Sequence, residues 1–264
     1  MEICPQTLFT GRPAIWLPVC GSTNTELQLL VLQNRASEGC AVITGHQSAG
    51  RGQRGNVWQA APHENLLLSV LWKPTFLGAT RQFLLSQAVA LAVHDWAVAL
   101  LGPDPRLRLK WPNDVYFGEQ KLGGILIENS LAGANLQHSI VGIGLNVNQQ
   151  YLPLPTATSL AVLTGRAYDL ATLAARLFES LERRYLQLRA GQVARLRTDY
   201  LAVLYRYQEP ATFIVDGQVV SGQIAGVDED GRLAVQLGQE LRRFGMQEIK
   251  FGPAATAGGA TLSC

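Results

Sequence analysis

The chain has 264 residues, of which 47% are apolar and 16% are charged, and its formal net charge is +2. This length suits one large domain with or without a small companion, and the apolar fraction is enough for a sizeable core. The near-neutral balance argues against a broad nucleic-acid-binding surface, but it does not exclude a local basic patch.

The cysteines form no pattern typical of a disulfide framework or a metal site. They are widely spaced and include no C-x-x-C pair: Cys4, Cys20, Cys40 and Cys264. Because metal sites need clustered ligands, we expect reduced thiols without a special role.

No targeting or membrane segment is evident. The N-terminus lacks a basic region followed by an apolar core, and the apolar run 88–101 is interrupted by His94 and Asp95. These features predict neither a signal peptide nor a membrane span, and therefore a soluble cytoplasmic protein.

The first predicted elements alternate between helices and strands. Thr23 and Glu26 fit a capping box, and the leucines that follow have helical spacing, which predicts a helix start. The apolar runs 40–44 and 65–72 are typical of strands, and 80–101 predicts a long helix without Gly or Pro.

The middle of the chain predicts strands joined by a tight turn. Residues 106–111 alternate between polar and apolar, and Pro112 should end that strand. Residues 113–128 fit a hairpin that turns at Gly118-Glu119 with Gly first, as in a type II′ turn, and 139–148 fits a further strand.

Helical periodicity covers 169–206, and Gly191 should divide this region into two helices. After Glu209-Pro210 the sequence pattern changes from helical periodicity to short β runs. Short β runs with Asp-Gly turn signals predict a small all-β module from 209 to 252. We expect a larger domain over 1–208 and a disordered tail over 253–264.

The stretch "SAGRGQRGNVW" (48–58) combines glycines and arginines without a carboxylate. Its G-x-G-x-x-G spacing resembles a dinucleotide fingerprint, but no helical periodicity follows Gly55, and no acidic residue lies near the expected offset. A Walker A loop is also excluded, because Arg51-Gly52 stands where Lys-Ser/Thr is required.

A mobile anion clamp remains for this loop, with a solvated basic loop as the alternative. Glycine backbones can close over a ligand, and Arg51 and Arg54 supply guanidinium groups that match carboxylate and phosphate. Taken by itself, the motif leaves both interpretations open.

Two further stretches favour a binding site. In "IVGIGLNVN" (140–148), the period of two places Gly142 and Gly144 on the face of Ile140, Asn146 and Asn148, opposite the aliphatic residues. Glycines inside a strand indicate close approach to the backbone, by a ligand or by another element.

The second stretch carries two lysines on neighbouring predicted strands. Lys110 lies on the polar face of its strand, and Lys121 precedes Gly123-Gly124, again a place of close backbone approach. Without the glycines, each lysine would be interpreted as a solvated surface residue.

Taken together and in order, these stretches resemble the motifs of biotin–protein ligases. They are "STN" (22–24), "HQSAGRGQRGNVW" (46–58), "KWPND" (110–114), "KLGGILIE" (121–128) and "VGIGLNVN" (141–148). The resemblance implies an α+β fold, with a mixed-sheet catalytic domain followed by a small SH3-like β-barrel.

The same resemblance implies an activity. Biotin and ATP would give biotinyl-5′-adenylate and pyrophosphate, and a lysine of a biotin carboxyl carrier domain, such as that of acetyl-CoA carboxylase, would then be biotinylated. Magnesium is expected with ATP. Neither nucleic acid nor membrane is expected as a partner, and the chain is a monomer or a homodimer.

The resemblance also implies roles for individual residues. Lys121 and Arg51 would be catalytic. The biotin-binding residues would be Ser22, Thr23, Asn24, Gln47, Arg51, Gly52, Gln53, Lys121 and Gly124. The ATP- and adenylate-binding residues would be Arg51, Gln53, Trp58, Lys110, Asn113, Asp114 and Asn146.

One departure concerns the loop, because the family often has G-R-G-R-R-G and this chain has Gln53 at the second arginine. An uncharged Gln53 would retain the adenylate less strongly unless Arg54 compensates. Since few residues precede Ser22, we expect no helix-turn-helix domain and hence a monofunctional ligase. The alternatives are a lipoate or octanoate ligase or transferase, and a non-catalytic biotin- or nucleotide-binding protein.

Overall fold

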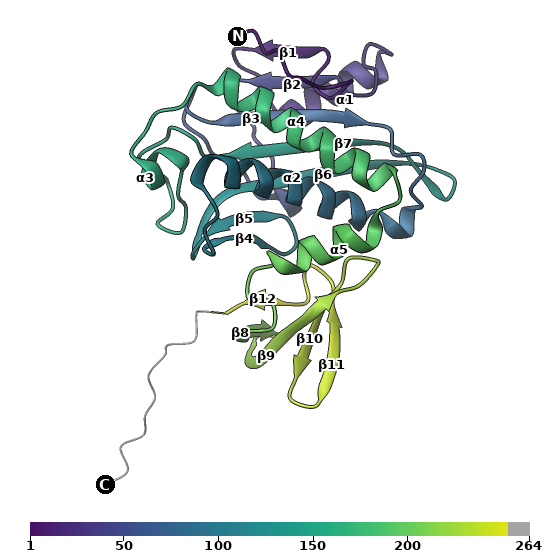
Figure 1. The fold of residues 1–264 in the computed structure, drawn as a ribbon, viewed down its shortest axis with the longest axis vertical. Coiled ribbons are helices and arrows are strands. Elements are labelled where there is room, and N and C mark those ends of the chain that lie inside the picture. The colour runs from purple at the N-terminus through teal and green to yellow at the C-terminus, as the bar shows by residue number, and fades with distance from the viewer. Residues whose placement is uncertain (253–264) are drawn as a thin grey trace.

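The strands form two separate sheets, a large one near the N-terminus and a small one near the C-terminus (Figure 1). The computed structural model describes residues 1–252, with only the backbone of Arg54 described. The tail expected over 253–264, including Cys264, lies outside the described residues.

The large sheet has seven strands in the order β1-β2-β3-β7-β6-β5-β4. Strands β1 and β2 are parallel, and the other neighbours are antiparallel, so the sheet is mixed, as expected. Its strands are β1 (Ala14–Leu17), β2 (Ala41–Thr44), β3 (Leu66–Trp72), β4 (Leu107–Lys110), β5 (Asp114–Phe117), β6 (Gln120–Ala132) and β7 (Asn135–Leu145).

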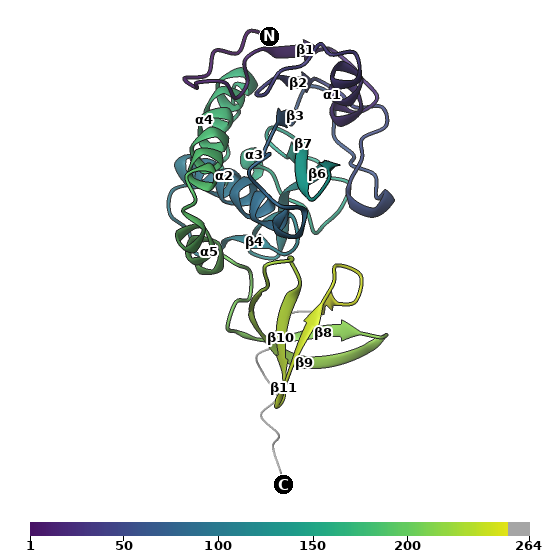
Figure 2. The ribbon, with the colours of Figure 1, turned by 90° about the vertical axis from the view of Figure 1, so that its right-hand side faces the viewer.

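Helices cover both faces of this sheet. Figure 2 shows α2 and α4 on one side of the strands and α1 on the other. The helices are α1 (Thr23–Leu32), α2 (Phe83–Leu101), α3 (Leu160–Thr164), α4 (Leu170–Arg189) and α5 (Val193–Ala202), with 3-10 turns η1 (Gln53–Gly55) and η2 (Ala79–Arg81). Strand β3 is buried along its whole length because both of its faces are covered.

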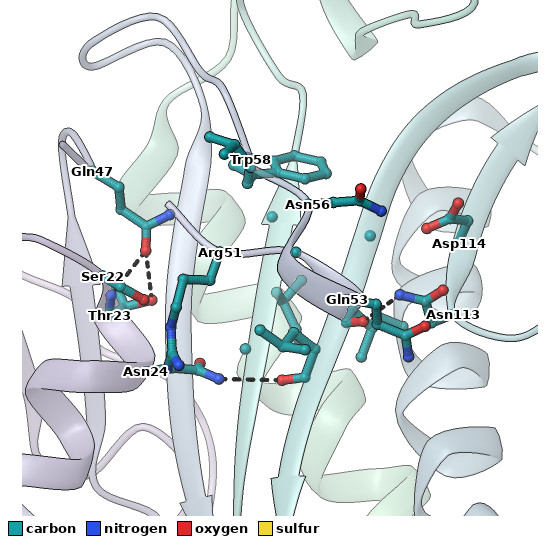
Figure 3. Close-up of a pocket in the computed structure, with 18 of the residues that line it drawn as sticks. Ser22, Thr23, Asn24, Gln47, Arg51, Gln53, Asn56, Trp58, Asn113 and Asp114 are labelled. Atoms are coloured by element: carbon teal, nitrogen blue, oxygen red, sulfur yellow. Dashed lines mark hydrogen bonds between the residues drawn. The ribbon is translucent and has the colours of Figure 1, made fainter. Parts of the chain in front are cut away.

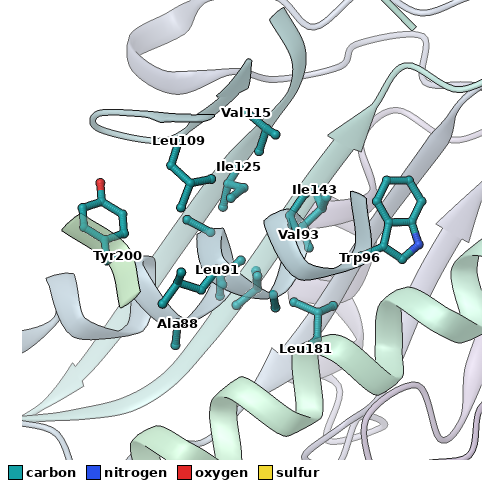
Figure 4. Packing of buried hydrophobic residues seen from close by; sticks show 14 of the residues in the cluster. Ala88, Leu91, Val93, Trp96, Leu109, Val115, Ile125, Ile143, Leu181 and Tyr200 are labelled. Carbon is teal, nitrogen blue, oxygen red and sulfur yellow. The ribbon is translucent and has the colours of Figure 1, made fainter. Parts of the chain in front are cut away.

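The main core lies between the sheet and α2, and it confirms the predicted strand faces (Figure 4). Val141, Ile143 and Leu145 of β7 belong to this core. Ile140 instead packs with Leu27 of α1 in a separate cluster on the other face. The glycines of β7 therefore face the side of α1.

Residues 79–101 are long and apolar enough to cross a membrane by composition alone, with a mean hydropathy of 1.6. The shorter apolar run 88–101, which was expected to fall short of a membrane span, forms the second part of this stretch. Most of its most apolar window, 61%, is buried inside the protein, where α2 packs against α4 and the sheet. The helix is therefore a core element of this fold.

The small sheet has five antiparallel strands in the order β11-β10-β9-β8-β12. They are β8 (Pro210–Val215), β9 (Gln218–Val227), β10 (Leu233–Leu237), β11 (Glu240–Phe244) and β12 (Lys250–Phe251). Asp216 and Gly217 both have positive φ, 51° and 79°, as a two-residue hairpin turn requires. This sheet is consistent with the expected SH3-like module.

Several local predictions are confirmed. Phe117 pairs with Gln120, so the hairpin turns at Gly118-Glu119, and Gly118 has a φ of 60°. The helical region after Asp169 breaks at Gly191, whose φ is 73°.

Other local predictions need correction. The capping box is absent: Ser22 is the N-cap, and the hydroxyl of Thr23 instead donates to Gln47. Strand β7 ends at Leu145 rather than at residue 148, because the asparagines that follow bond to loop backbone. Strand β1 and helix α3 were not predicted.

Candidate functional site

A cavity opens above the glycines of β6 and β7, beneath the loop 50–58. Figure 3 shows Ser22, Thr23, Asn24 and Gln47 on one side of it, and Gln53, Asn113 and Asp114 on the other. The structure brings most of the predicted site residues together in its lining: Ser22, Thr23, Asn24, Gln47, Arg51, Gly52, Gln53, Trp58, Asn113, Asp114, Lys121 and Gly124.

One end of the cavity is a network of uncharged side chains. The backbone N–H of Thr23 donates to Oε1 of Gln47 at 2.8 Å, and its hydroxyl donates to the same oxygen at 3.2 Å. Ser69 of β3 lies within hydrogen-bond distance of Thr23 Oγ1, at 2.7 Å, and of Asn24 Oδ1, at 2.5 Å. These contacts fix the orientation of the amides, so this end is preorganised.

The floor of the cavity is shaped by the two glycines of β7. A β-carbon at Gly142 would collide with the side chain of Asn24, and one at Gly144 would lie 2.6 Å from Cε2 of Trp58. The sequence predicted close approach to this face, and the structure shows that side chains from α1 and the glycine loop make it.

The glycine loop folds back on itself, because Gly52 N donates to Asn56 O and Trp58 N donates to Gly50 O. No α-helix follows it before β3, in agreement with the rejection of the dinucleotide fingerprint. Arg51 donates through Nη2 to Oε2 of Glu128 at 2.8 Å, and both side chains are close to half exposed. The expected clamp residue is thus paired with a carboxylate.

The other end of the cavity carries charge. Nζ of Lys121 lies 2.7 Å from Oδ1 of Asp114 and 5.5 Å from the centre of the Trp58 ring. Both residues come from the β5–β6 hairpin, whose register places Asp114 opposite Gly124. Because Gly124 has no side chain, there is room beside the carboxylate of Asp114 and the ammonium of Lys121 for a charged reacting group.

Two predicted site residues, Lys110 and Asn146, do not line this cavity. Asn146 is buried and donates to Thr158 O at 3.0 Å, so its amide fastens the loop after β7. Lys110 lies with its ammonium among aromatic rings, 4.3 Å from the centre of Tyr116. The alternation of β4 placed Lys110 on the polar face correctly, but it did not indicate which neighbours cover that face.

Several residues near the site were not predicted, and three of them have side chains that bear on its chemistry or its wall. Asn56 and Met246 line the cavity, and Glu128 holds both Arg51 and the Nδ2 of Asn24, the latter at 2.6 Å. Asn56 and Glu128 lie inside the quoted motifs and could have been considered there. Met246 lies in the C-terminal module, and no feature of its local sequence points to the cavity.

Within residues 1–252, no group of three or more His, Cys, Asp or Glu side chains could hold a metal ion. The described cysteines are free, with Cys4 exposed and Cys20 and Cys40 buried. Burial raises the pKa of the thiols of Cys20 and Cys40, which favours the neutral, unreactive form.

Comparison with known proteins identifies the family of this chain. Residues 16–146 match the model of the biotin/lipoate A/B protein ligase family. A biotin–[acetyl-CoA-carboxylase] ligase from Mycobacterium tuberculosis is 35% identical over 221 residues, covering 83% of this chain and 81% of the relative. The enzyme of the same name from Paracoccus denitrificans is 34% identical over 237 residues, covering 88% and 97%.

A solved structure supports the fold. The biotin protein ligase from Aquifex aeolicus in complex with biotin and ATP has a TM-score of 0.75, with 24% sequence identity. The match covers 90% of this chain and 99% of that one. This chain therefore belongs to the biotin/lipoate A/B protein ligase family.

Proposed function

We propose that this protein is an ATP-dependent biotin–protein ligase that acts on a lysine of a biotin carboxyl carrier domain. The observation that carries the proposal is the cavity itself, in which Lys121 stands over the glycine floor and Arg51 lies beside the amide network, where Glu128 holds both Arg51 and Asn24. The relatives that bear this activity in their names match over most of the chain.

The first step joins two anions. A carboxylate oxygen of biotin attacks the α-phosphorus of ATP, the P–O bond to pyrophosphate breaks, and pyrophosphate leaves. Lys121 would offset the charge at the reacting carboxylate and α-phosphate, and Arg51 would leave Glu128 to hold the same anions. Fixed cations at such a point stabilise the transition state more than the separated reactants.

In the second step, the neutral amine of the carrier lysine attacks the acyl carbon. The C–O bond to the phosphate breaks, AMP leaves, and the proton lost from nitrogen passes to solvent. Since water also attacks a mixed anhydride, the glycine loop would serve by covering the adenylate. The uncharged Gln53 of that loop would retain it less strongly than an arginine.

The uncharged end of the cavity suits the fused rings of biotin. Thr23, Asn24 and Gln47 offer hydroxyl and amide groups that internal bonds already orient, and Ser22 adds a further hydroxyl to the lining. We assign the nucleotide to the charged end, where Trp58 offers an aromatic surface and Asn113 an amide.

Magnesium fits the charged end as a companion of ATP. Mg²⁺ commonly uses one or two carboxylates together with substrate phosphates, and Asp114 offers one carboxylate in the lining. Bound there, the ion would neutralise phosphate charge. Division into a catalytic domain (1–208) and a C-terminal domain (209–252), a cytoplasmic location, and a monomeric or homodimeric state stay predictions.

The decisive experiment supplies labelled biotin, ATP and Mg²⁺ together with a purified carrier domain. We expect pyrophosphate release and label on one carrier lysine. Lipoate and octanoate, offered in parallel, test the rival acyl substrates. Absence of transfer with bound biotin would instead favour a non-catalytic binding protein.

A further inference from the structure

The segment 109–114 contacts the C-terminal module at one end and lines the cavity at the other. The backbone of Leu109 pairs with the linker, donating to Val203 at 2.9 Å and accepting from Tyr205 at 2.8 Å. Nε1 of Trp111 donates to the carbonyl of Gly231, in the turn before β10, at 2.9 Å. The next three residues line the cavity: Pro112, Asn113 and Asp114.

Lys110 lies at the centre of this segment, inside an aromatic cage formed by Tyr116, Phe251 and Tyr205. Its Nζ is 4.3, 5.0 and 5.3 Å from the three ring centres in that order. Within residues 1–252, no carboxylate oxygen lies within ion-pair distance of this ammonium. Burial lowers the pKa of Lys110, while the charge of Asp114 acts in the opposite direction. The rings therefore provide the compensation for lost water.

The cage is built from both sheets. Tyr116 belongs to β5, whereas Phe251 belongs to β12, which pairs with β8 in the small sheet. Figure 1 shows β12 close below β4 and β5. Arg206 strengthens this junction by donating to the carbonyl of Gly252 at 3.1 Å and to Glu119 at 3.2 Å. Lys110 is thus a direct contact between the two sheets.

The position of the small sheet matters to the cavity. Met246, which follows β11, lines it beside Gln53 and Asn113. Met246 and Asp230 also line an adjoining cavity that shares these two amides and is lined by Phe83 of α2 as well. A shift of the small sheet would therefore open one wall at the charged end and leave the amide network at the opposite end intact.

We infer that Lys110 is a positioning residue: held in the aromatic cage, it fixes the small sheet so that Met246 completes the cavity wall beside Asn113. Its ammonium contacts no substrate. The competing model has Lys110 leave the cage and bind a phosphate of ATP. The kinetic tests of this inference rest on the proposed function.

The kinetic test compares Lys110→Met with Phe251→Leu, a change outside the cavity lining. If Lys110 acts through the cage, each variant should raise the KM for ATP about tenfold, the size of a partly buried cation–π contact. The KM for biotin should stay within about twofold, because the amide end is untouched. The double variant should add little to either single change, and Lys110→Arg should retain most of the wild-type value.

Two results would overturn the inference. Phe251→Leu could leave the KM for ATP at the wild-type value while Lys110→Met raises it, which a direct phosphate contact predicts. The double variant could instead show the full sum of the two effects. Lys250→Met, an exposed neighbour on the same strand, serves as the matched control and should behave as wild type.

A second measurement needs no activity. Amide hydrogen exchange of the whole chain without substrates should quicken at residues 245–249 in Lys110→Met and not in Lys250→Met. Unchanged exchange there would also overturn the inference. A wild-type protein without biotin-dependent pyrophosphate release would refute the proposed function, whereas the exchange result would still decide the role of Lys110.

Discussion

The two ends of the cavity are built in different ways. At the amide end, Thr23, Gln47 and Asn24 are oriented by hydrogen bonds among themselves and to β3. At the charged end, Lys121 faces Asp114, and the wall is completed by Met246 from the loop that follows β11 of the small sheet. A neutral ring system needs fixed donors and acceptors, whereas a reacting anion needs cations whose partners can change. We expect substitutions at the charged end to affect rate most.

The largest effect is expected for Lys121→Ala. Loss of one preorganised contact to developing charge typically costs about 100- to 1,000-fold in rate. Pyrophosphate release should fall by that factor while biotin still binds. Because the pair with Asp114 is partly exposed, unfolding free energy should change by less than about 1 kcal/mol. Lys73→Ala, an exposed lysine, is the control. Normal adenylate synthesis in Lys121→Ala would remove this residue from the site.

A smaller effect, on retention rather than on formation, is expected for Arg51→Ala. Hydrogen bonds to charged groups contribute about 1.5–3 kcal/mol, so the adenylate should escape about ten- to a hundredfold more readily. Labelling of bystander proteins, measured on a blot with the carrier absent, should rise accordingly. Arg35→Ala, on an exposed loop, should leave labelling unchanged. If labelling is also unchanged in Arg51→Ala, the loop does not act as a clamp on the adenylate.

Gly144→Ala tests the floor between the two ends. The added methyl group meets the indole of Trp58, and such overpacking usually destabilises a protein by about 1–3 kcal/mol. Urea unfolding should show this loss, and the KM for ATP should rise as the indole moves. Gly226→Ala in β9 is the matched control, since no atom lies within 4 Å of its added carbon. Equal stability of both variants would contradict the close approach described for Trp58.

The smallest effect is expected for Glu128→Gln. The glutamine still accepts from Asn24, but it no longer attracts Arg51, and an exposed ion pair contributes only about 0.2–1 kcal/mol. Freed from its partner, Arg51 should bind anions better, so the dissociation constant of biotin should fall about two- to fivefold by calorimetry. Glu240→Gln is the control. Weaker binding of biotin would mean that Glu128 holds Arg51 in a productive position.

Patterns within a few residues were enough to predict much of the fold. The alternation of 140–148 predicted which face of β7 is core, and Gly118 predicted the β5–β6 turn. The prediction for 22–26 failed because Ser22 is the N-cap and the hydroxyl of Thr23, which could have capped the helix, donates to Gln47 instead. A side chain with two available partners cannot be assigned from local sequence.

The sequence by itself determined the strand faces, the hairpin and the order of motifs that bring Arg51 and Lys121 to one site. Only the tertiary structure decided that Arg51 pairs with Glu128, that Lys110 lies in a cage, and that Met246 reaches the cavity. The physical reason is the sequence separation over which each kind of interaction acts. Periodicity and turn chemistry act between near neighbours, whereas these contacts join residues far apart in the chain. Those of Lys110 and Met246 also depend on how the two sheets pack together.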